Sequence, residues 1–458
     1  MGTVFDTALF GRFKLGYKVS ANDFQKYGML ALLPWSLKPV IGLVSDRFPI
    51  CGHKKRFYVI LFGACGIAAS SAMAFYNTTL SIHATIFCVF LTSFQLAGTD
   101  LLTESEYAKV MALNPTSSAS IVSIVWMFVF AGQIIGGTIS GVGIKLNNGD
   151  ILFWLLIPCC VQLVLPAVMG WYDDSTCTPS RCDQGLAVVA MCIATSAITL
   201  SIVSIYTTWQ VRLCICIIIA LVMLALTRKY LAPTIAASNM YMFTASILNV
   251  EIPGTLNYWY TADETCVPGG PGFTMEFFVL TSGIVGAVSG AAAVLLFRYT
   301  PMQHWEFRTL FCTTTFLRCA TALIDIAIVN RWNIHIGVPD RIFFILGKAC
   351  VQSAVTMLEQ TPAVILTSKL CTAGNESTIY AILAGFQNLG MAISLVVGTV
   401  LADSFGVHLT PGVCTYSNLP YLISVANILL PMLSAPLSYW LVPPGTSSSE
   451  SSLIQNIR

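Results

Sequence analysis

Residues 151–172 read ILFWLLIPCCVQLVLPAVMGWY, a run that contains no Asp, Glu, Lys or Arg. A helix needs about 20 mostly apolar residues to cross the hydrocarbon core of a bilayer, whereas a membrane β-strand would alternate apolar and polar residues. The continuous run therefore predicts a transmembrane helix. Similar runs predict about thirteen such helices in all, at residues 24–43, 57–75, 81–101, 120–143, 151–172, 185–207, 211–231, 236–258, 273–297, 306–329, 342–368, 376–402 and 418–442.

The composition indicates the same class of protein. Charged residues make up 10% of the 458 residues and hydrophobic residues 56%, with a net charge of +2 and a mean hydropathy of +0.76. Soluble domains usually carry about 25% charged residues. The values exclude an ordinary soluble enzyme, a disordered protein and a nucleic-acid-binding protein, because these need more polar surface or concentrated charge. We expect an all-α polytopic membrane protein.

The sequence lacks motifs for catalysis and metal binding. It has no P-loop, GxSxG or HExxH motif, and only five His residues. Most of its sixteen Cys residues lie in apolar runs, where they act as small hydrophobic side chains. We therefore expect no enzyme activity, no catalytic residue, no metal site and no cofactor.

Basic residues predict the orientation in the membrane. Arg47, Lys54, Lys55 and Arg56 share the short loop after the first predicted helix, and Lys and Arg favour the cytoplasmic side of short loops. Alternation of the later spans then places the Ser-rich segment 443–458 in the cytosol, where we expect it to be disordered.

The same alternation places Cys266 and Cys414 outside, as the two cysteines in external loops of any length. An external compartment is oxidising enough to join them in a disulfide. The alternative is two free thiols in separate loops, because a disulfide needs Cα atoms within about 7 Å of each other.

Two pairs of segments indicate an internal repeat. The loop 45–56 has a degenerate counterpart at 297–308, in which basic, Pro and basic residues recur in the same order. In a second pair, Asp100 corresponds to Glu359-Gln360. The later Gly132-Gln133 then corresponds to the segment 388–390, at a similar offset. Two homologous halves, as in many transporters, would explain both. The first half has few residues before its matching span, so its first helix is expected to be truncated.

The segment Leu33-Pro34-Trp35-Ser36-Leu37-Lys38-Pro39 precedes Gly42, Ser45-Asp46-Arg47 and Lys55-Arg56. This combination resembles the signature of the folate–biopterin transporter family of the major facilitator superfamily, and most of all its kinetoplastid members. The part from Gly42 to Arg56 is similar to the general superfamily motif between the second and third helices. The resemblance covers about residues 21–441, with further family-like segments at 239–241, 252–254, 258–261 and 367–369.

The resemblance implies two six-helix bundles. We expect an N-terminal bundle at 1–172, two extra membrane helices within 173–235, and a C-terminal bundle at 236–442. It also implies a monomeric secondary active transporter of folate or pteridines such as biopterin, working by alternating access, most readily in the plasma membrane. A gating role for Gly42, Asp46, Arg47 and Arg56 follows from the family motif. Whether transport is coupled to protons stays open. Two alternatives also stay open: a carrier of the same fold for another small polar metabolite, and a truncated paralogue that does not transport.

Charged residues at membrane depth are costly and predict functional positions. The acidic ones are Asp100, Glu251, Asp325 and Glu359, and the basic ones are Lys38, Arg318 and Lys348. Cations would bind the carboxylates of a folate, carboxylates would accept hydrogen bonds from a pterin edge, and aromatic rings would stack on it. The substrate-binding candidates are Trp35, Lys38, Asp100, Arg318, Lys348 and Glu359, and the proton-coupling candidates are Asp100, Asp325 and Glu359. Static ion pairs between helices, and simple packing of Trp35, are the alternatives.

Overall fold

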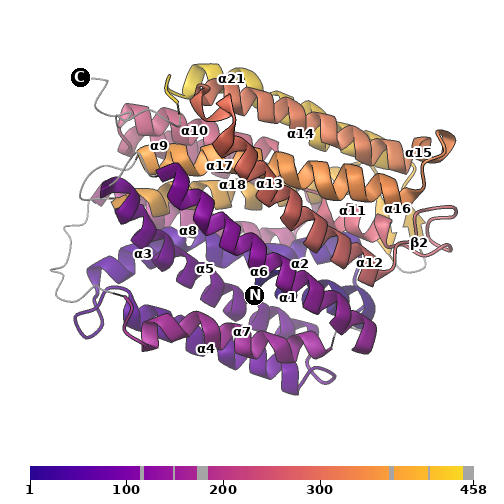
Figure 1. Cartoon of the computed structure of the whole chain (residues 1–458), viewed down its shortest axis with the longest axis horizontal. Helices are drawn as coiled ribbons and strands as arrows, with labels where there is room; N and C mark the ends of the chain where they lie inside the picture. Colours follow the sequence, from indigo (N-terminus) through magenta and orange to yellow (C-terminus); the bar gives the residue numbers. More distant parts are fainter. Residues whose placement is uncertain (114–117, 148–149, 173–183, 371–375, 411–412, 447–458) are drawn as a thin grey trace.

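The computed structural model of the chain describes all residues except 114–117, 148–149, 173–183, 371–375, 411–412 and 447–458 (Figure 1). The described part is almost entirely helical, with one two-stranded hairpin. Labels with η mark π-helical turns, apart from η4, which is a 3-10 turn. The elements are α1 (Gly2–Gly11), η1 (Arg12–Gly16), α2 (Ala21–Ser36), α3 (Lys38–Arg47), α4 (Arg56–Phe75), α5 (Ile82–Leu113), α6 (Ser118–Asn147), α7 (Ile151–Val168), α8 (Gln184–Tyr206), α9 (Trp209–Tyr230), α10 (Pro233–Leu248), α11 (Pro253–Tyr260), α12 (Met275–Leu280), η3 (Thr281–Val285), α13 (Gly286–Tyr299), η4 (Pro301–His304), α14 (Phe307–Val329), α15 (Trp332–His335), α16 (Asp340–Phe343), η5 (Phe344–Gln352), α17 (Ser353–Lys369), α18 (Glu376–Ser404), β1 (His408–Thr410), β2 (Val413–Thr415), α19 (Leu419–Ser424), η6 (Val425–Leu429), α20 (Leu430–Met432) and α21 (Ser434–Leu441).

Twelve helical stretches among the described residues are long and apolar enough to cross a membrane. Each corresponds to one of the thirteen predicted spans, which confirms the all-α polytopic membrane class. Several stretches join consecutive elements, as when α2 and α3 form one span over Ala21–Arg47. Pro34 and Pro39 cause the bend between them, since proline cannot donate a backbone hydrogen bond.

The thirteenth predicted span, 236–258, is not one continuous helix. α10 ends at Leu248 and α11 begins at Pro253, and the backbone between them is not helical. Hydropathy averages over such a break and does not detect it. The prediction of a single span is therefore wrong, and the break places Glu251 between two half-helices.

The helices form two groups that meet along the middle of the molecule. α1 packs on α6 and α7, α4 packs on α5 and α7, and α2 packs on α5. In the other group, α10 packs on α18 and α21, α13 on α17, and α14 on α17 and α21. Figure 1 shows the first group in indigo to magenta below the second in orange and yellow. α8 packs on α2, α3 and α18, and α9 packs on α8, α10 and α18, so this pair touches both groups.

The first helix is more complete than the sequence analysis predicted. α1 and η1 make one continuous helix over residues 2–16, with Val4, Phe5, Ala8 and Leu9 buried. This helix is still shorter than the roughly 20 residues that cross a bilayer. Figure 1 shows the N terminus about halfway between the two ends of the molecule.

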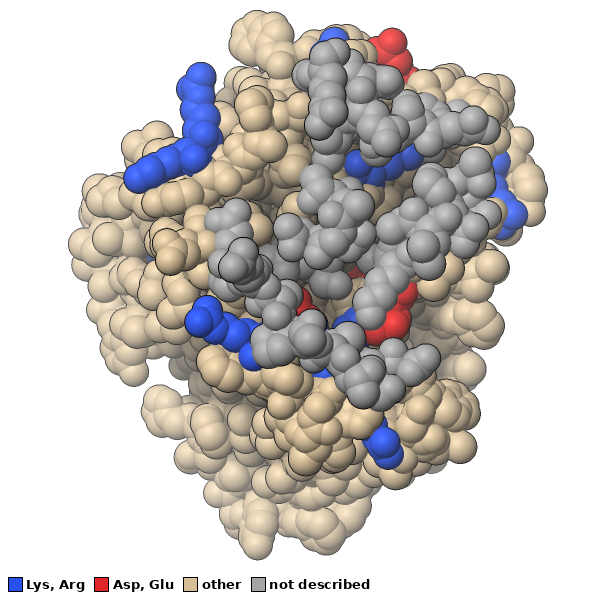
Figure 2. Space-filling model, turned by 90° about the vertical axis from the view of Figure 1, so that its left-hand side faces the viewer, with Lys and Arg blue, Asp and Glu red and all other residues tan. Residues whose placement is uncertain are grey.

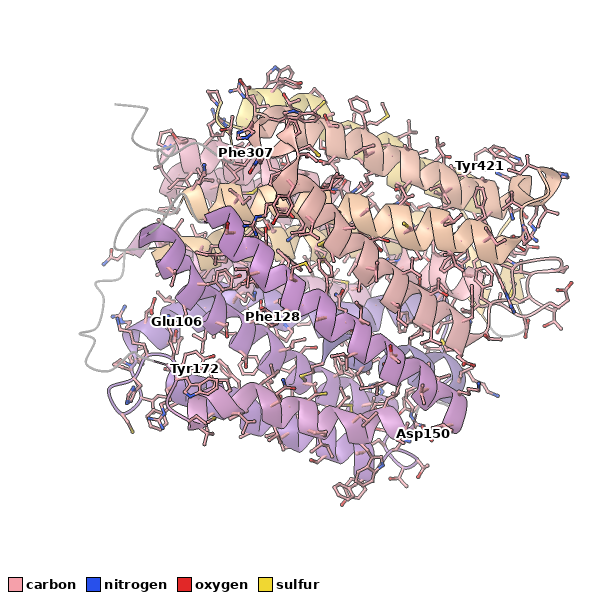
Figure 3. The ribbon with its side chains drawn as sticks, in the orientation of Figure 1. Glu106, Phe128, Asp150, Tyr172, Phe307 and Tyr421 are labelled. Atoms are coloured by element: carbon pink, nitrogen blue, oxygen red, sulfur yellow. A yellow bond between two sulfur atoms is a disulfide. The ribbon has the colours of Figure 1, made fainter. Side chains whose placement is uncertain are left out.

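The loops gather at the two ends of the helices. The end predicted to be cytosolic carries Lys and Arg side chains at several places (Figure 2). Glu106 and Tyr172 lie near this end, whereas Asp150 and Tyr421 lie near the opposite one (Figure 3). Phe128, about halfway along α6, is 76% exposed, as expected of a side chain that faces lipid.

Residues 445 and 446, which the sequence analysis assigned to a disordered tail, are held by hydrogen bonds. The carbonyl of Gly445 accepts a hydrogen bond from the backbone N–H of Phe307, at 2.9 Å. Lys369 donates to the carbonyl of Thr446 at 3.0 Å. The tail therefore starts as an ordered strap across the ends of α14 and α17, and residues 447–458 lie outside the described residues.

Candidate functional site

A cavity of about 760 Å³ lies between the two groups of helices. Its walls come from α1, η1, α2, α5 and α6 on one side and from α11, α12, η3, α13, η5 and α17 on the other. A cavity between two bundles is where a transporter that rocks its halves holds its cargo. This cavity is therefore the candidate functional site.

Three π-helical turns contribute to the cavity wall. Phe13 comes from η1, Ser282 and Gly283 from η3, and Lys348 and Gln352 from η5. A π turn inserts extra backbone into a helix and occurs mostly at functional sites. The run of π geometry over 344–352 thus places Lys348 at the cavity in a stretch that hydropathy alone reads as an ordinary apolar helix.

Aromatic rings cover much of the cavity surface. The ring centroids of Phe10 and Phe24 lie 5.4 Å apart, and those of Phe10 and Phe278 lie 6.2 Å apart. Phe278 also approaches Phe344 at 5.6 Å. Rings at these separations pack on one another, and Phe10 and Phe344 are buried. Phe24, Tyr27 and Phe278 are half-buried, so these rings present surface to the cavity. The aromatic lining residues are Phe10, Phe13, Phe24, Tyr27, Phe130, Tyr260, Phe278 and Phe344.

The charged side chains among the described lining residues are Asp6 and Lys348. Lys348 is paired: its Nζ lies 2.6 Å from Oδ2 of Asp325. The other oxygen of Asp325 accepts a hydrogen bond from the hydroxyl of Tyr260 at 2.6 Å. Asp6 is exposed to the cavity. Amides and hydroxyls supply the remaining polar lining, from Thr3, Thr7, Gln133, Asn257, Ser282, Gln352, Ser353 and Thr356.

A second ion pair lies on the same two helices. Arg318 contacts Glu359 at 2.6 Å and Glu251, in the helix break, at 3.6 Å. Asn249 donates to Glu359 at 3.0 Å. Arg318 and Asp325 both lie on α14, and Arg318 pairs with α17 whereas Asp325 pairs with the preceding η5. Arg318 and Glu359 are not among the residues that line the cavity.

Lys38, a candidate for substrate binding, is 2% exposed and is not among the residues that line the cavity. Its Nζ lies 2.6 Å from Asp100 and 2.9 Å from Glu104, and 4.7 Å from the centre of the Trp35 ring. Trp35 and Asp100 are not among the lining residues either. Lys38 is buried in this cluster, whereas the side chain of Asp100 is 41% exposed. The contacts agree with the alternative of static ion pairs.

The loop motif is held by contacts within the first group of helices. Arg56 donates to the carbonyl of Ala167 at 2.9 Å, at the end of α7. Lys55 pairs with Glu106. Gly42 approaches the second group, since a Cβ there would lie 3.5 Å from Cβ of Ala381. Arg47 is exposed and Asp46 is half-buried, so the gating role of this motif stays a prediction.

At the end of the molecule opposite the basic loops, hydrogen bonds join the two groups of helices. Lys14 donates to the carbonyl of Thr261 at 2.8 Å, and the hydroxyl of Tyr258 donates to the carbonyl of Val19 at 3.0 Å. Cys266 and Cys414 are joined in a disulfide, with their Cα atoms 5.3 Å apart, as the predicted topology allowed.

Gln25 of α2 occupies the break between α10 and α11. Its Nε2 donates to the carbonyls of Glu251 and Leu395, at 3.0 and 2.9 Å. Its Oε1 accepts from the N–H of Gly254 at 3.2 Å. Gly254 and Gly398 permit this approach, since a Cβ on Gly398 would lie 2.2 Å from the carbonyl oxygen of Glu251.

The sequence analysis missed two of these residues, Asp6 and Gln25. Asp6 interrupts the apolar stretch Thr3 to Phe10, and this signal would have been visible had residues 2–16 been recognised as a membrane helix. Gln25 gave no signal, because a single amide near the end of a span is common and its partner is a helix break that only the fold reveals.

The chain is similar to several known proteins. The model of the BT1 family matches residues 4–453. The chain is 25% identical over 435 residues to "Probable folate-biopterin transporter 6" of Arabidopsis thaliana, covering 93% of this chain and 77% of that protein. It is 24% identical to the "Folate-biopterin transporter" of Synechocystis sp., covering 88% and 72%. It is 23% identical to "Folate transporter 1" of Plasmodium falciparum, covering 86% and 67%.

Solved transporters share the fold. An auto-inhibited POT family peptide transporter aligns with a TM-score of 0.60 at 12% identity, covering 98% of this chain and 97% of that one. A human organic anion transporter aligns with a TM-score of 0.57 at 12% identity, covering 96% and 88%. At such identities the likeness shows the fold alone, which is that of a two-bundle membrane transporter.

Proposed function

Because this chain belongs to the BT1 family, we propose that it carries folate, biopterin or a related pteridine across a membrane by alternating access. The family and its named members are transporters and not enzymes. The substrate is inferred from relatives whose names specify folate or biopterin.

The observation that carries this proposal is the aromatic cavity between the two groups of helices. A pterin is a flat heteroaromatic ring, and the half-buried rings of Phe24, Tyr27 and Phe278 line the cavity where it could stack. Lys348 supplies a cation at the same cavity for the carboxylates of a folate tail. A site that combined stacking faces with one cation would suit folate better than a small amino acid.

We propose that Asp325 carries the coupling proton. In this structure it neutralises Lys348 at 2.6 Å. A proton on Asp325 would remove that partner and leave Lys348 available to an anionic substrate. Asp100 and Glu359, the other coupling candidates, are each bound to a cation away from the cavity. For Trp35, Lys38, Asp100, Arg318 and Glu359 we therefore favour the role of holding helices together.

The remaining parts of the proposal concern organisation and location. We divide the chain into bundles at 1–172 and 236–442 with an inter-bundle segment at 173–235, and we propose a monomer. The Cys266–Cys414 disulfide favours an oxidising compartment at that end, as outside the plasma membrane. The kinetoplastid likeness stays a prediction.

Uptake in cells that lack their own folate and pteridine carriers tests the proposal. We expect saturable uptake of labelled folate and biopterin, each competing with the other, and faster uptake when the outer pH is lowered. Lys348→Ala should weaken folate uptake more than biopterin uptake, since biopterin has no carboxylate. Lys145→Ala, at an exposed lysine of α6, is the matched control.

The alternatives give different outcomes. Uptake of an amino acid or nucleoside without folate or biopterin would identify a carrier of the same fold with another substrate. A chain that reaches the membrane and moves none of them would be a non-transporting paralogue. Either result rejects the proposal.

A further inference from the structure

Asp6 is an unneutralised charge in the cavity wall. Its side chain is exposed, and it lines a cavity whose surface is mostly aromatic and aliphatic. Within the described residues it forms no hydrogen bond and no ion pair. The amino group of Met1, at the start of the same helix, is a cation whose field reaches it.

The contrast with Lys348 shows why Asp6 stands out. Lys348 is matched by Asp325, which is itself held by Tyr260. The cavity wall therefore carries a cation, Lys348, that contacts a carboxylate, and a carboxylate, Asp6, that contacts no cation among the described residues. An isolated carboxylate at membrane depth is costly and marks a functional position unless a ligand or proton completes it.

We propose that Asp6 anchors the amino-pyrimidinone edge of a pterin ring by accepting two parallel hydrogen bonds, from the ring N3–H and the 2-amino group. This inference rests on the proposed function, and it specifies which part of the substrate the cavity recognises.

The chemistry of the pair supports the assignment. A carboxylate accepts two parallel hydrogen bonds from a planar fork of donors, as it does from an arginine. The 2-amino-4-oxo edge of a pterin presents such a fork in the plane of its ring. Phe10, one turn along α1 from Asp6, also lines the cavity. Phe10 is buried and packs on Phe24, with ring centroids 5.4 Å apart. Phe24 is half-buried and lines the same cavity, so its ring can stack on the heterocycle whose edge Asp6 binds.

The arrangement also orients a folate. Its tail carboxylates would be repelled by Asp6 and attracted to Lys348, which lies on the opposite wall, in η5. A ring at Asp6 and a tail toward Lys348 is then the favoured pose. Biopterin would use the Asp6 end alone.

Lumazine provides the test, because it has an oxygen where a pterin has the 2-amino group. In transport-deficient cells, wild-type uptake of labelled biopterin is competed by unlabelled pterin or by lumazine. We expect pterin to compete at least about tenfold better, since hydrogen bonds to a charged group are strong ones. Asp6→Asn puts an amide donor opposite that oxygen, so the preference should fall to nearly one or reverse. Asp6→Glu should keep the preference for pterin.

Asp150→Asn is the matched control, because Asp150 lies in a loop at the end away from the basic loops (Figure 3) and does not line the cavity. Surface abundance is measured for every variant. Should Asp6→Asn not reach the surface, Asp6→Ser removes the same charge and is put through the same competition.

The outcomes separate this inference from the proposed function. A wild-type chain that moves no pteridine and no folate defeats both. A wild-type chain that transports biopterin, with an unchanged pterin-to-lumazine ratio in the Asp6 variants, overturns only the anchor. That second result, with a flattened pH profile, would make Asp6 a proton carrier instead.

Discussion

Gln25→Leu should destabilise the protein through the break between α10 and α11. The substitution keeps the size of a side chain that is 3% exposed but removes its three hydrogen bonds. The carbonyl of Leu395 lies within α18 and keeps its helical partner. The carbonyl of Glu251 loses its partner because it lies in the non-helical break, and the N–H of Gly254 loses its partner because the first turn of α11 offers it no helical acceptor.

Each buried group left without a partner costs about 1–3 kcal/mol, so the two together cost about 2–6 kcal/mol. Burial of the leucine offsets about 1.5–3 kcal/mol of this, so the middle of the range gives a net loss of about 2 kcal/mol. The loss should appear as a lower midpoint of thermal aggregation for the detergent-purified protein, followed by size-exclusion chromatography.

Gln184→Leu is the control, since Gln184 is exposed at the start of α8. A Gln25→Leu protein that is as stable as both the wild type and this control would refute the account of the break as a site that Gln25 completes. Gln25 also joins the two groups of helices, since it lies on α2 and its carbonyl partners belong to the second group.

Three other changes test separate features. A membrane-impermeant thiol reagent should label Cys266 and Cys414 only after reduction, and labelling of either in untreated cells would argue against the disulfide. Lys38→Met should cost about 1–3 kcal/mol, because it leaves Glu104, whose side chain is 17% exposed, without its cation, whereas Asp100 is open enough to water to be hydrated. Adding Glu104→Gln should recover part of that loss, and no recovery in the thermal midpoint would contradict the ion-pair reading. Gly398→Ala should lower membrane abundance, because its Cβ would lie 2.2 Å from the carbonyl oxygen of Glu251, whereas Gly132→Ala, with no atom within 4 Å, should not.

The sequence predicted the membrane-spanning helices well because hydropathy is a property of each segment by itself. It failed at 236–258, where Pro233 and Pro253 begin two half-helices that share one apolar run. It also failed at residues 2–16, where the helix is too short to score as a span.

The candidate site was harder to predict because charge partners depend on which helices become neighbours. Lys38 and Asp100 were both singled out from the sequence, yet Glu104, the second partner of Lys38, was not. Lys348 was predicted at the cavity and lies there, but its engagement by Asp325 needs the packing of α14 on η5. Asp6 could not be identified as a candidate site residue from the sequence, because its segment was not predicted to be a helix that lines the cavity.

The two seams between the halves of the molecule are built differently. At one, α8 lies against α2 and α18 together, so it braces both halves along its length. At the other, α6 crosses η3 where a Cβ on Gly137 would lie 3.4 Å from Cα of Gly283, with no side chain interposed. A rotation of the halves would have to slide packed helices past each other at both seams: α8 against α2 and α18 at the first, and α6 against α12, η3 and α13 at the second. With glycine on both sides of the closest approach, the second seam presents backbone instead of interlocking side chains to such a movement.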